Sequence, residues 1–543
     1  MTSISHLPLE LVIKILCYLD WRDALSCTQV CRLFNNIVNE SVELQYNFEL
    51  AAAGMEDGPP SILSIADRLH CLRRREAAWN RLQWTSDQTM PMQSGGVWEL
   101  YGGVLAQARS RYELCFTRLP SQIRGIEQKD WEIYLPMLVR DFGMEPSLDL
   151  LVVVEQGSVL YVSYLKCVHR SVDQIVYSGN YRIHLLQLST GKTHHDAPNP
   201  ALLHHQTAGA NYSFVIQISR EYLAIMFISS DDNDSYLVVW NWKTGEIEMS
   251  LRGLEIGSFG FLTERHILLA VVDNPLIDPP PEHTEPSLLV VDFLKAPNQP
   301  MAVLDVTFEC AFHYPVMFPW ASALAISVRS DPSPMWTPHP DPRVPFHTAQ
   351  RDRLFVITLW VAEGANISTL MLFVPSFTIL DKLNSLAPGI SGRRFEWTEW
   401  GPSGTQMRFA PRGHSMVWVC YVFGMSFVAP YRPGLPHAAD QPTGATRIQV
   451  FDFNQLAIKR QLAQGGKFME DEDEDEVTRI ITEPSTVTLN RIFTRQIVTS
   501  LPYRWRMKEV SETQTFDSAM LSEDSIVTVS SGPDTRKYRV LSF

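Results

Sequence analysis

The sequence predicts a mainly β protein that begins with a short α-helical domain. Three observations support this fold class. Apolar residues recur at helical spacing over the first part of the chain, up to about residue 45. Beyond residue 98, short apolar runs alternate with glycine, proline and polar clusters. The 35 prolines and 26 phenylalanines favour many short strands joined by tight loops over a helical bundle.

Length, charge and cysteine usage narrow the class of protein. A chain of 543 residues can bury more than one core, so we expect about two or three folded units. The net charge of −14 argues against a protein that wraps nucleic acid, because binding phosphates needs a large basic surface. No run of about 18 uncharged apolar residues occurs, so we expect neither a membrane span nor a signal peptide, and a cytoplasmic or nuclear location. The eight cysteines form no C-x-x-C pair, which favours reduced, mostly buried thiols over disulfides or a zinc site.

The first apolar segment has the pattern of one helix with an unusually wide apolar face. Pro8 stands where a first helical turn tolerates proline, and Glu10 and Lys14 mark the polar side. The opposite sector holds Leu11, Val12, Ile15, Leu16, Tyr18 and Leu19. A face this wide on so short a helix indicates two neighbours, the rest of its own domain and a partner outside it.

Two further short helices are expected next. Asp20 and Asp23 have the spacing of an N-cap and a first-turn acid, which starts a second helix and directs Leu25 inward. Four-residue apolar steps predict a third helix from about residue 28, at Val30, Phe34 and Val38. Three helices of this size bury too little surface to be stable alone, and a protein partner is the remaining source of stability.

Three segments in this region stand in a fixed order and spacing: Leu7-Pro8-Leu9-Glu10-Leu11, Tyr18-Leu19-Asp20 and Val30-Cys31-Arg32-Leu33-Phe34. Together they resemble an F-box, which implies a domain over residues 1–48 that binds the Skp-type adaptor of a cullin ubiquitin ligase. The resemblance implies that adaptor binding depends on Leu7, Pro8, Leu11, Ile15, Leu16, Leu19, Leu25, Val30, Cys31 and Phe34. An ordinary helical cap on a larger domain is the alternative.

Residues 49–95 are predicted to form a helical linker. A break rich in small residues and proline at 51–61 ends one helix, and apolar spacing predicts another over 61–84. This second helix carries Arg73, Arg74 and Arg75. The triplet is compatible with a nucleic-acid contact, but its acidic neighbours favour a solvated helix face.

Residues 96–543 are predicted to form a β-propeller of about seven blades. Segments 186–192 and 239–246 repeat one form, an alternating strand that enters a turn with lysine, threonine and glycine, and 448–454 is a weaker copy. Strands are expected at 98–105, 148–154, 159–165, 182–188, 214–218, 223–228, 236–242, 267–272, 288–293, 354–361, 370–374, 416–422, 448–453 and 526–529.

The propeller segment also resembles known proteins. The turns above, together with Tyr101-Gly102-Gly103-Val104 and Leu119-Pro120-Ser121, resemble F-box proteins expanded in mushroom-forming fungi. This resemblance implies a WD-like propeller fused to an F-box, without a substrate. Closure of the ring predicts that the final strands, 525–529 and 538–543, pair in the blade that holds 98–105.

Other segments suggest sites, but a structural role explains them more simply. The acidic run 470–476 favours a solvated loop over a contact for a basic tail, and the proline-rich 275–286 and 332–345 favour long blade connections over polyproline ligands. A loop is favoured over a metal site for four histidines, because they lack the spacing of metal ligands on one helix face: His194, His195, His204 and His205. A phosphorylated ligand would need convergence of Arg393, Arg394, Arg408 and Arg412.

The chain contains no recognisable phosphate loop, nucleophile elbow or paired-carboxylate motif. We therefore expect no enzyme activity, no metal and no cofactor. The sequence predicts a substrate receptor of a Skp–cullin–F-box ubiquitin ligase, in which the propeller holds a protein substrate near the charged conjugating enzyme. A scaffold that acts outside any ligase is the alternative, and neither nucleic acid nor a membrane is an expected partner.

Overall fold

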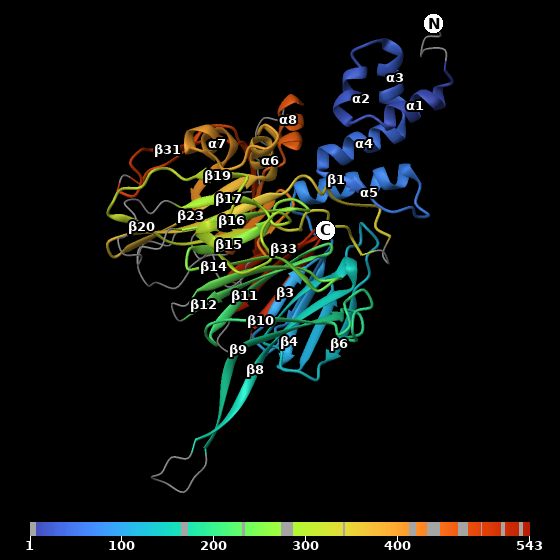
Figure 1. Ribbon diagram of the computed structural model, residues 1–543. Helices are drawn as coiled ribbons and strands as arrows, with labels where there is room; N and C mark the ends of the chain where they lie inside the picture. Colours follow the sequence, from blue (N-terminus) through green and yellow to red (C-terminus); the bar gives the residue numbers. More distant parts are fainter. Residues whose placement is uncertain are drawn as a thin grey trace.

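The computed structural model describes residues 7–163, 172–230, 234–272, 286–339, 343–411, 420–431, 446–464, 476–489, 491–511, 516–531 and 536–543. A group of N-terminal helices stands at one side of a larger body of β-sheets (Figure 1). Within the described ranges, no helix is both long enough and apolar enough to cross a bilayer.

Five helices form the N-terminal part: α1 (Leu9–Cys17), α2 (Trp21–Cys27), α3 (Arg32–Glu40), α4 (Val42–Ala53) and α5 (Ile65–Asn80). Local signals set their ends. The Asp20 side chain accepts the Arg22 amide at the start of α2, and Ser64 and Asp67 form a capping box at the start of α5. Gly54, at φ 67°, ends α4 in the left-handed conformation that glycine adopts without strain. The third helix begins at Arg32, later than the sequence predicts, because Cys31 before it is extended.

Seven sheets form the β part, and the first strand of each lies beside the first strands of its neighbours around a common axis. Blade 1 contains β3 (Trp98–Tyr101), β4 (Val104–Ser110), β5 (Glu113–Arg118) and β6 (Lys129–Tyr134). Blade 2 contains β7 (Asp141–Glu145), β8 (Leu150–Ser163), β9 (Val172–Gln187) and β10 (Leu202–Gln206). Blade 3 contains β11 (Tyr212–Ser219), β12 (Tyr222–Ser229), β13 (Ser235–Asn241) and β14 (Glu246–Gly253), with β18 (Met301–Ala302) added in parallel.

Blades 4 to 6 continue in the same order. Blade 4 contains β15 (Ile256–Phe261), β16 (His266–Val271), β17 (Ser287–Asp292), β19 (Cys310–His313) and β24 (Arg393–Phe395). Blade 5 contains β20 (Ala321–Arg329), β22 (Leu354–Glu363), β23 (Asn366–Pro375) and β25 (Gln406–Phe409). Blade 6 contains β26 (Val422–Phe423), β27 (Ser426–Tyr431), β28 (Thr446–Asp452), β32 (Tyr503–Ser511) and β29 (Glu476–Ile481). Two small sheets pair β1 (Met55–Asp57) with β21 (Phe346–Thr348) and β30 (Ser485–Val487) with β31 (Ile497–Thr499).

Blade 7 closes the ring and corrects the predicted pairing. It joins β33 (Ser518–Leu521), β34 (Ser525–Ser531) and β35 (Arg536–Ser542) to β2 (Ser86–Pro91). Segment 98–105 lies instead in blade 1, where it bends into the β3–β4 hairpin at Gly102 and Gly103. The outer strand of the closing blade therefore comes from the stretch predicted as a helical linker, and its backbone covers an edge that β35 would otherwise expose.

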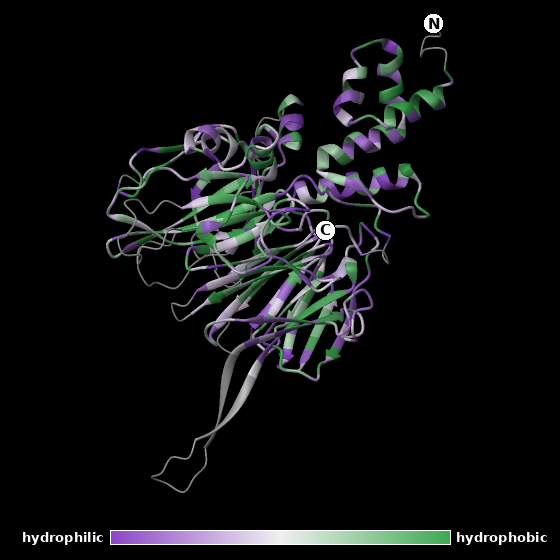
Figure 2. Cartoon of the chain, viewed as in Figure 1, coloured by the Kyte–Doolittle hydropathy of each residue, from purple (hydrophilic) through white to green (hydrophobic). Residues whose placement is uncertain are grey.

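The described part thus confirms a mainly β fold with N-terminal helices and a seven-bladed propeller. Strands in the blades are apolar on both faces because sheets pack on either side of them, and the run from Leu150 to Val154 is 0% exposed throughout. Figure 2 shows this concentration of hydrophobic residues in the sheets. The seven described cysteines are free thiols, although only Cys310 and Cys420 are buried and Cys31 is exposed.

The propeller has two different faces. The helices α6 (Ser376–Asn384), α7 (Trp397–Gly404) and α8 (Gln455–Ala463) lie on the same side as α4 and α5, whereas the β8–β9 hairpin projects from the other side (Figure 1). The described parts of the proline-rich segment 332–345, residues 332–339 and 343–345, lie between β20 and β22 of blade 5, as the sequence predicts. Residues 164–165, 275–285, 340–342, 412, 416–419 and 470–475, on which other predictions fall, lie outside the described residues.

Candidate protein-docking site

Helix α1 has two apolar sides with different surroundings. Val12 and Leu16 are 2% and 3% exposed and pack in a small core with Phe34 and Ile37. The other side is between 38% and 47% exposed and consists of Leu7, Leu11, Ile15 and Leu19. The wide apolar face therefore divides as the sequence predicts, except that Leu16 belongs to the core rather than to the surface expected to meet a partner.

Helices α2 and α3 extend the exposed side. Leu25 is 48% exposed, which corrects the prediction that it points inward, since Ala24 takes the buried position of α2. Residues are about 100° apart around a helix, so the neighbour of a buried residue readily faces solvent. Val30 is 70% exposed in the turn before α3. Of the three predicted contact residues Leu25, Val30 and Phe34, only Phe34 lies in the core.

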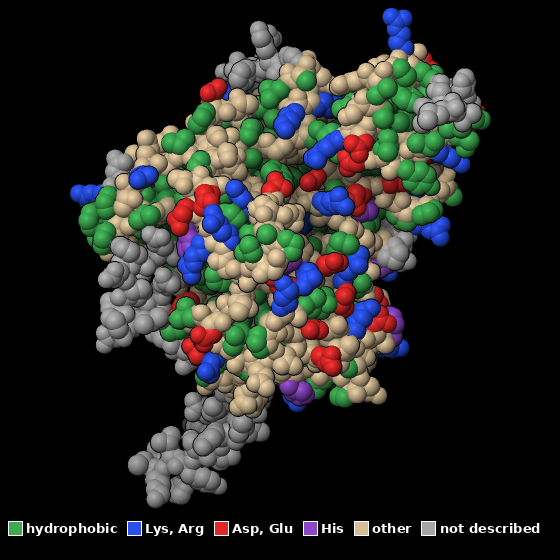
Figure 3. Space-filling model, turned by 45° about the horizontal axis from the view of Figure 1, so that its top comes forward, with side chains coloured by type: hydrophobic (Ala, Val, Ile, Leu, Met, Phe, Trp, Pro, Cys, Tyr) green, Lys and Arg blue, Asp and Glu red, His purple; other side chains and the backbone are tan. Residues whose placement is uncertain are grey.

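These side chains make up an exposed apolar surface on a very small domain. Its members are Leu7, Leu9, Leu11, Ile15, Tyr18, Leu19, Leu25, Val30 and Leu33. Figure 3 shows hydrophobic side chains gathered over this helical domain at the upper right of the view. Exposed apolar side chains gathered in this number on a small domain are typical of a protein interaction site. Leu9, Tyr18 and Leu33 were not among the predicted contact residues, because their exposure depends on how the three helices pack.

Helix α4 and strand β1 connect this domain to blade 5. The Tyr46 hydroxyl donates to the Pro345 carbonyl at 3.0 Å, and β1 pairs with β21 just beyond it. Arg68, 6% exposed, donates to Asp57 at 2.6 Å and to the Pro59 carbonyl at 2.7 Å. Segment 332–345 is therefore more than a long connection, since its end holds the helical domain against the propeller.

Helix α5 lies on blades 6 and 7. The Trp79 ring stacks on Phe543 with centroids 3.9 Å apart, and the Trp79 carbonyl accepts a hydrogen bond from Arg506. Arg75 is 7% exposed and donates to the Glu523 carbonyl at 2.9 Å. Of the arginine triplet only Arg73 and Arg74 lie on the solvated face that the sequence predicts for all three.

A buried ionic cluster fixes the junction. The Arg124 side chain is 4% exposed and contacts Glu523 at 2.7 Å and Asp524 at 2.5 Å. Arg124 also donates to the Phe346 carbonyl at 2.9 Å, and the Thr348 amide donates to Glu523 at 2.5 Å. Blade 1, blade 7 and β21 therefore meet at one set of paired charges, which holds the exposed apolar surface in a fixed direction.

The axis of the propeller contains an acidic cavity that the sequence did not predict. The cavity has a volume of about 340 Å³ and is lined by Glu99, Asp141 and Asp331, from blades 1, 2 and 5. Burial raises the pKa of Asp141 to about 7 and of Asp331 to about 6, and it raises the pKa of Glu99 well above its ordinary value. No single stretch of sequence carries this grouping, so only the closed ring reveals it.

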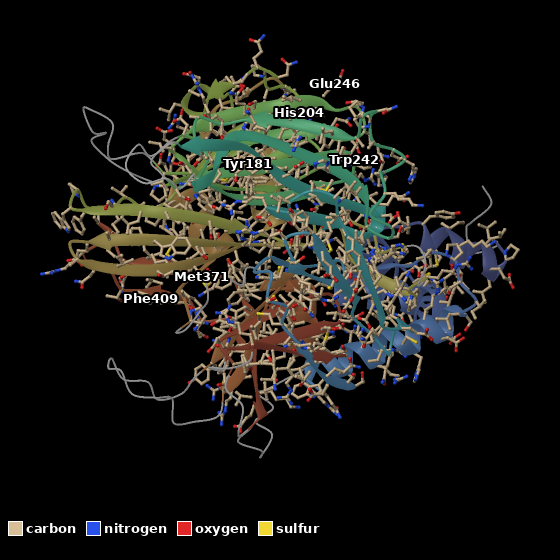
Figure 4. All side chains as sticks on the ribbon, turned by 90° about the horizontal axis from the view of Figure 1, so that it is seen from below. Tyr181, His204, Trp242, Glu246, Met371 and Phe409 are labelled. Atoms are coloured by element: carbon tan, nitrogen blue, oxygen red, sulfur yellow. The ribbon has the colours of Figure 1, made fainter. Side chains whose placement is uncertain are left out.

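The sequence places the four histidines in a loop, and the structure divides them. His194 and His195 lie in the connection before β10, whereas His204 and His205 lie in β10 itself, which corrects the loop prediction for that pair. The His194 Nε2–H donates to the Leu148 carbonyl (3.0 Å) and the His194 ring stacks on His195, while His205 packs among aromatic rings beside Phe227. Figure 4 places His204 on the blades coloured teal to green, in the same part of the ring as Tyr181 and Trp242.

Two other clusters in the described part have ligand types that suit a metal: Glu113, Cys115 and Glu132, and His266, Asp292 and Glu309. Basic side chains already neutralise both. Arg109 contacts Glu113 at 2.5 Å and Glu132 at 2.6 Å, and Arg265 contacts Asp292 at 2.5 Å.

The arginine convergence that a phosphorylated ligand would require is not seen among the described arginines. Arg393 pairs with Glu399 at 3.0 Å, and Arg394 lies over the Phe308 ring. Arg408 instead reaches the Tyr503 hydroxyl at 2.5 Å between blades 5 and 6. The structure therefore brings together no phosphate-binding group from these three.

Comparison with known protein families identifies the helical domain. Residues 4–48 match the model of the family described as F-box-like. Residues 4–48 form an F-box-like domain. The match covers the exposed apolar surface and its core, and it ends before the propeller begins. No curated protein matches the chain.

Solved structures resemble the chain only distantly. A Drosophila semaphorin 1b, extracellular domains 1–2, is 7% identical over 85% of this chain and 88% of its own, with a TM-score of 0.37. A mutant of the Synechocystis apocarotenoid oxygenase is 9% identical over 56% of this chain, with a TM-score of 0.25, and this chain spans 61% of its length. An uncharacterized protein of Listeria monocytogenes is 8% identical over 60% of this chain and 82% of its own, with a TM-score of 0.26. Likeness at this level carries no argument about function.

Proposed function

We propose that this protein is the substrate-recognition subunit of a Skp–cullin–F-box ubiquitin ligase. Its F-box-like domain binds the Skp-type adaptor, and its propeller binds a protein substrate. The protein takes no part in the chemistry, works in the cytoplasm or nucleus, and needs neither metal nor cofactor. The exposed apolar surface of the F-box-like domain is the observation that carries this proposal.

The composition of that surface supports adaptor binding. F-box domains generally bind Skp-type adaptors, and the α1 side chains here stand clear of the core in the manner of helix-in-groove anchors. Leu7, Leu11 and Ile15 are each at least 40% exposed, so they have apolar area left to bury. Burial of such area is the main source of affinity in contacts of this type.

The junction supports the second half of the proposal. Ubiquitin transfer by proximity requires that the substrate be held at a defined distance from the conjugating enzyme. Trp79 and Arg75 anchor α5 to the propeller through buried contacts, and α4 packs against α5, so packed helices hold the F-box-like domain. The propeller face opposite the helices is free of this domain, so we assign substrate binding to that face.

Co-purification with a Skp-type adaptor tests the proposal. We compare the wild-type chain with a Leu7→Ala/Pro8→Ala/Leu11→Ala variant, whose buried Val12 and Leu16 are unchanged. Central anchors of an interface cost about 2 kcal/mol or more each, so we expect adaptor affinity to fall at least about 100-fold. A Leu304→Ala/Ile367→Ala variant, which removes exposed apolar residues of the propeller (65% and 63% exposed), is the matched control.

The outcomes separate three functions. Loss of the complex in the triple variant alone supports adaptor binding, and absence of a complex with the wild-type chain would overturn it. Cullin recruitment with cullin-dependent turnover of a bound protein supports the ligase. Adaptor binding without either would instead identify the alternative, an F-box and propeller scaffold that acts outside a ligase.

A further inference from the structure

A second cavity lies beside the junction rather than on the propeller axis. It has a volume of about 380 Å³ and opens between the β3–β4 turn and the β5–β6 connection of blade 1, the turns of blade 2, the β33–β34 turn of blade 7, and residues 336–339 with Val344. The walls therefore come from five parts of the chain, and the last of them lies beside Pro345, whose carbonyl accepts a hydrogen bond from Tyr46 of the F-box-like domain. Neither the adaptor surface nor the axial channel includes it.

The floor of this cavity is apolar. Leu119, Leu188 and Val344 line it and are at most 4% exposed. Trp336 lines it too and is 5% exposed. The floor therefore offers a ligand apolar and aromatic side chains but not the indole N–H of Trp336, because that nitrogen is itself buried.

The rim of the cavity is basic. Arg118 donates its Nε–H to the Glu127 carbonyl at 3.0 Å, and Lys129 lies over the Trp131 ring at 5.8 Å. Within the described ranges, neither cation forms an ion pair with a carboxylate. Asp149, an acid on the same rim, already accepts the amide and hydroxyl of Ser189, each at 2.7 Å.

Arg124, Glu523 and Asp524, which also line the cavity, are paired within the junction, and Asp149 keeps its negative charge on the rim. Glu523 and Asp524 are held by Arg124 and Arg75, as described above. The two rim cations are therefore available to an incoming group, and the apolar floor below them would repel a fully polar one. A cavity with apolar walls and a few convergent polar groups is the usual form of a small-molecule site.

We propose that this cavity binds an amphipathic organic anion. An aromatic or aliphatic body fills the floor between Leu119 and Leu188, and a carboxylate, sulfonate or phosphate pairs with Arg118 and Lys129. This site is independent of adaptor binding. Because residues 336–339 and Val344 form one wall and the adjacent Pro345 accepts a hydrogen bond from the F-box-like domain, an occupant would also stabilise the junction.

Calorimetric titration of the full chain with a matched pair of probes tests the site. Naphthalene-2-carboxylate has the predicted charge, and naphthalene-2-carboxamide has the same body without it. We expect the carboxylate to bind at least tenfold more tightly than the amide. The Arg118→Ala/Lys129→Ala variant should lose this preference.

Lys243→Ala is the control, because Lys243 lies over Trp242 at 5.3 Å in blade 3 much as Lys129 lies over Trp131. It should keep the wild-type preference. The rim residues are solvent-accessible, so their replacement should leave the circular-dichroism melting curve unchanged. Equal binding of the two probes, no binding of either, or an unchanged preference in the rim variant would each overturn the proposal.

Discussion

Replacing Arg124 with methionine tests whether the buried ionic cluster fixes the junction. The substitution keeps an apolar stem but removes contacts to Glu523 (2.7 Å), Asp524 (2.5 Å) and the Phe346 carbonyl (2.9 Å). It leaves the buried carboxylates of Glu523 and Asp524, 5% and 7% exposed, without the positive charge of Arg124 beside them. Removing one partner from a buried ion pair costs about 3–5 kcal/mol, because the other charge stays in a poorly solvated place.

The expected change in melting temperature follows from the size of the chain. At about 2.1 cal/mol/K per residue, unfolding of 543 residues has an entropy of about 1.1 kcal/mol/K, so Tm should fall by about 3–5 °C. Differential scanning calorimetry measures this shift. The control is Arg460→Met, which removes the more exposed pair with Glu49 (side chains 44% and 19% exposed) and should cost at most about 1 kcal/mol. Equal shifts in the two variants would refute the structural role of the cluster.

Three further predictions concern the propeller. Burial lowers the pKa of His205 to about 4 from an ordinary 6.5, so the unfolded chain takes up a proton that the folded protein does not. The buried neutral imidazole therefore leaves the stability of the fold unchanged above pH 6.5 and reduces it as the pH falls toward 4. Across this pH range, Tm should fall less steeply in His205→Phe than in the wild-type protein. An identical dependence of Tm on pH in the two proteins would contradict the burial effect. Burial raises the pKa of Asp141 to about 7, so its ionisation in the folded protein reduces stability as the pH rises from about 4 through 7. Asp141→Asn should therefore raise Tm more at pH 8 than at pH 5, and a gain that is equal at both pH values would count against the effect. Deletion of residues 538–543 removes most of β35 and the Phe543 ring that stacks on Trp79. The edges of β2 and β34 would then be unpaired, so size-exclusion chromatography should show aggregates. A monomer with an unchanged Tm would argue against a closed ring.

Local signals in the sequence were sufficient for the N-terminal helices and for fewer than half of the strands in the described part, and they did not predict α6, α7 or α8. Asp20 caps α2 through the next residues of the chain, and the apolar spacing of Val12 and Leu16 places both on one side of α1. Such signals act over one or two helical turns, so they do not depend on contacts with distant parts of the chain. The same spacing predicted a second, outward side of α1, although it could not say that Leu16 faces the core.

Strand β2 shows where local signals fail. Its sequence, Ser-Asp-Gln-Thr-Met-Pro, has no apolar alternation, and most of its side chains are exposed. It becomes a strand because β35 presents an unpaired edge to it, and that edge exists only once the ring has formed. The sequence assigned this stretch to the linker, beyond a helix expected to end near residue 84, and the strand was missed for a reason that lies more than 400 residues away in the chain.

The sequence by itself determined an N-terminal helical domain with an outward apolar side and a large body of short apolar strands. The tertiary structure alone decided which charges are buried and what they contact. Arg75 and Arg124 look like surface residues in the sequence but meet Glu523 and Asp524 in the junction, and Asp141 and Asp331 meet in the axial cavity. Apolar periodicity is encoded between neighbours, whereas burial of a charge depends on a counter-charge or a wall that folding brings from a distant part of the chain.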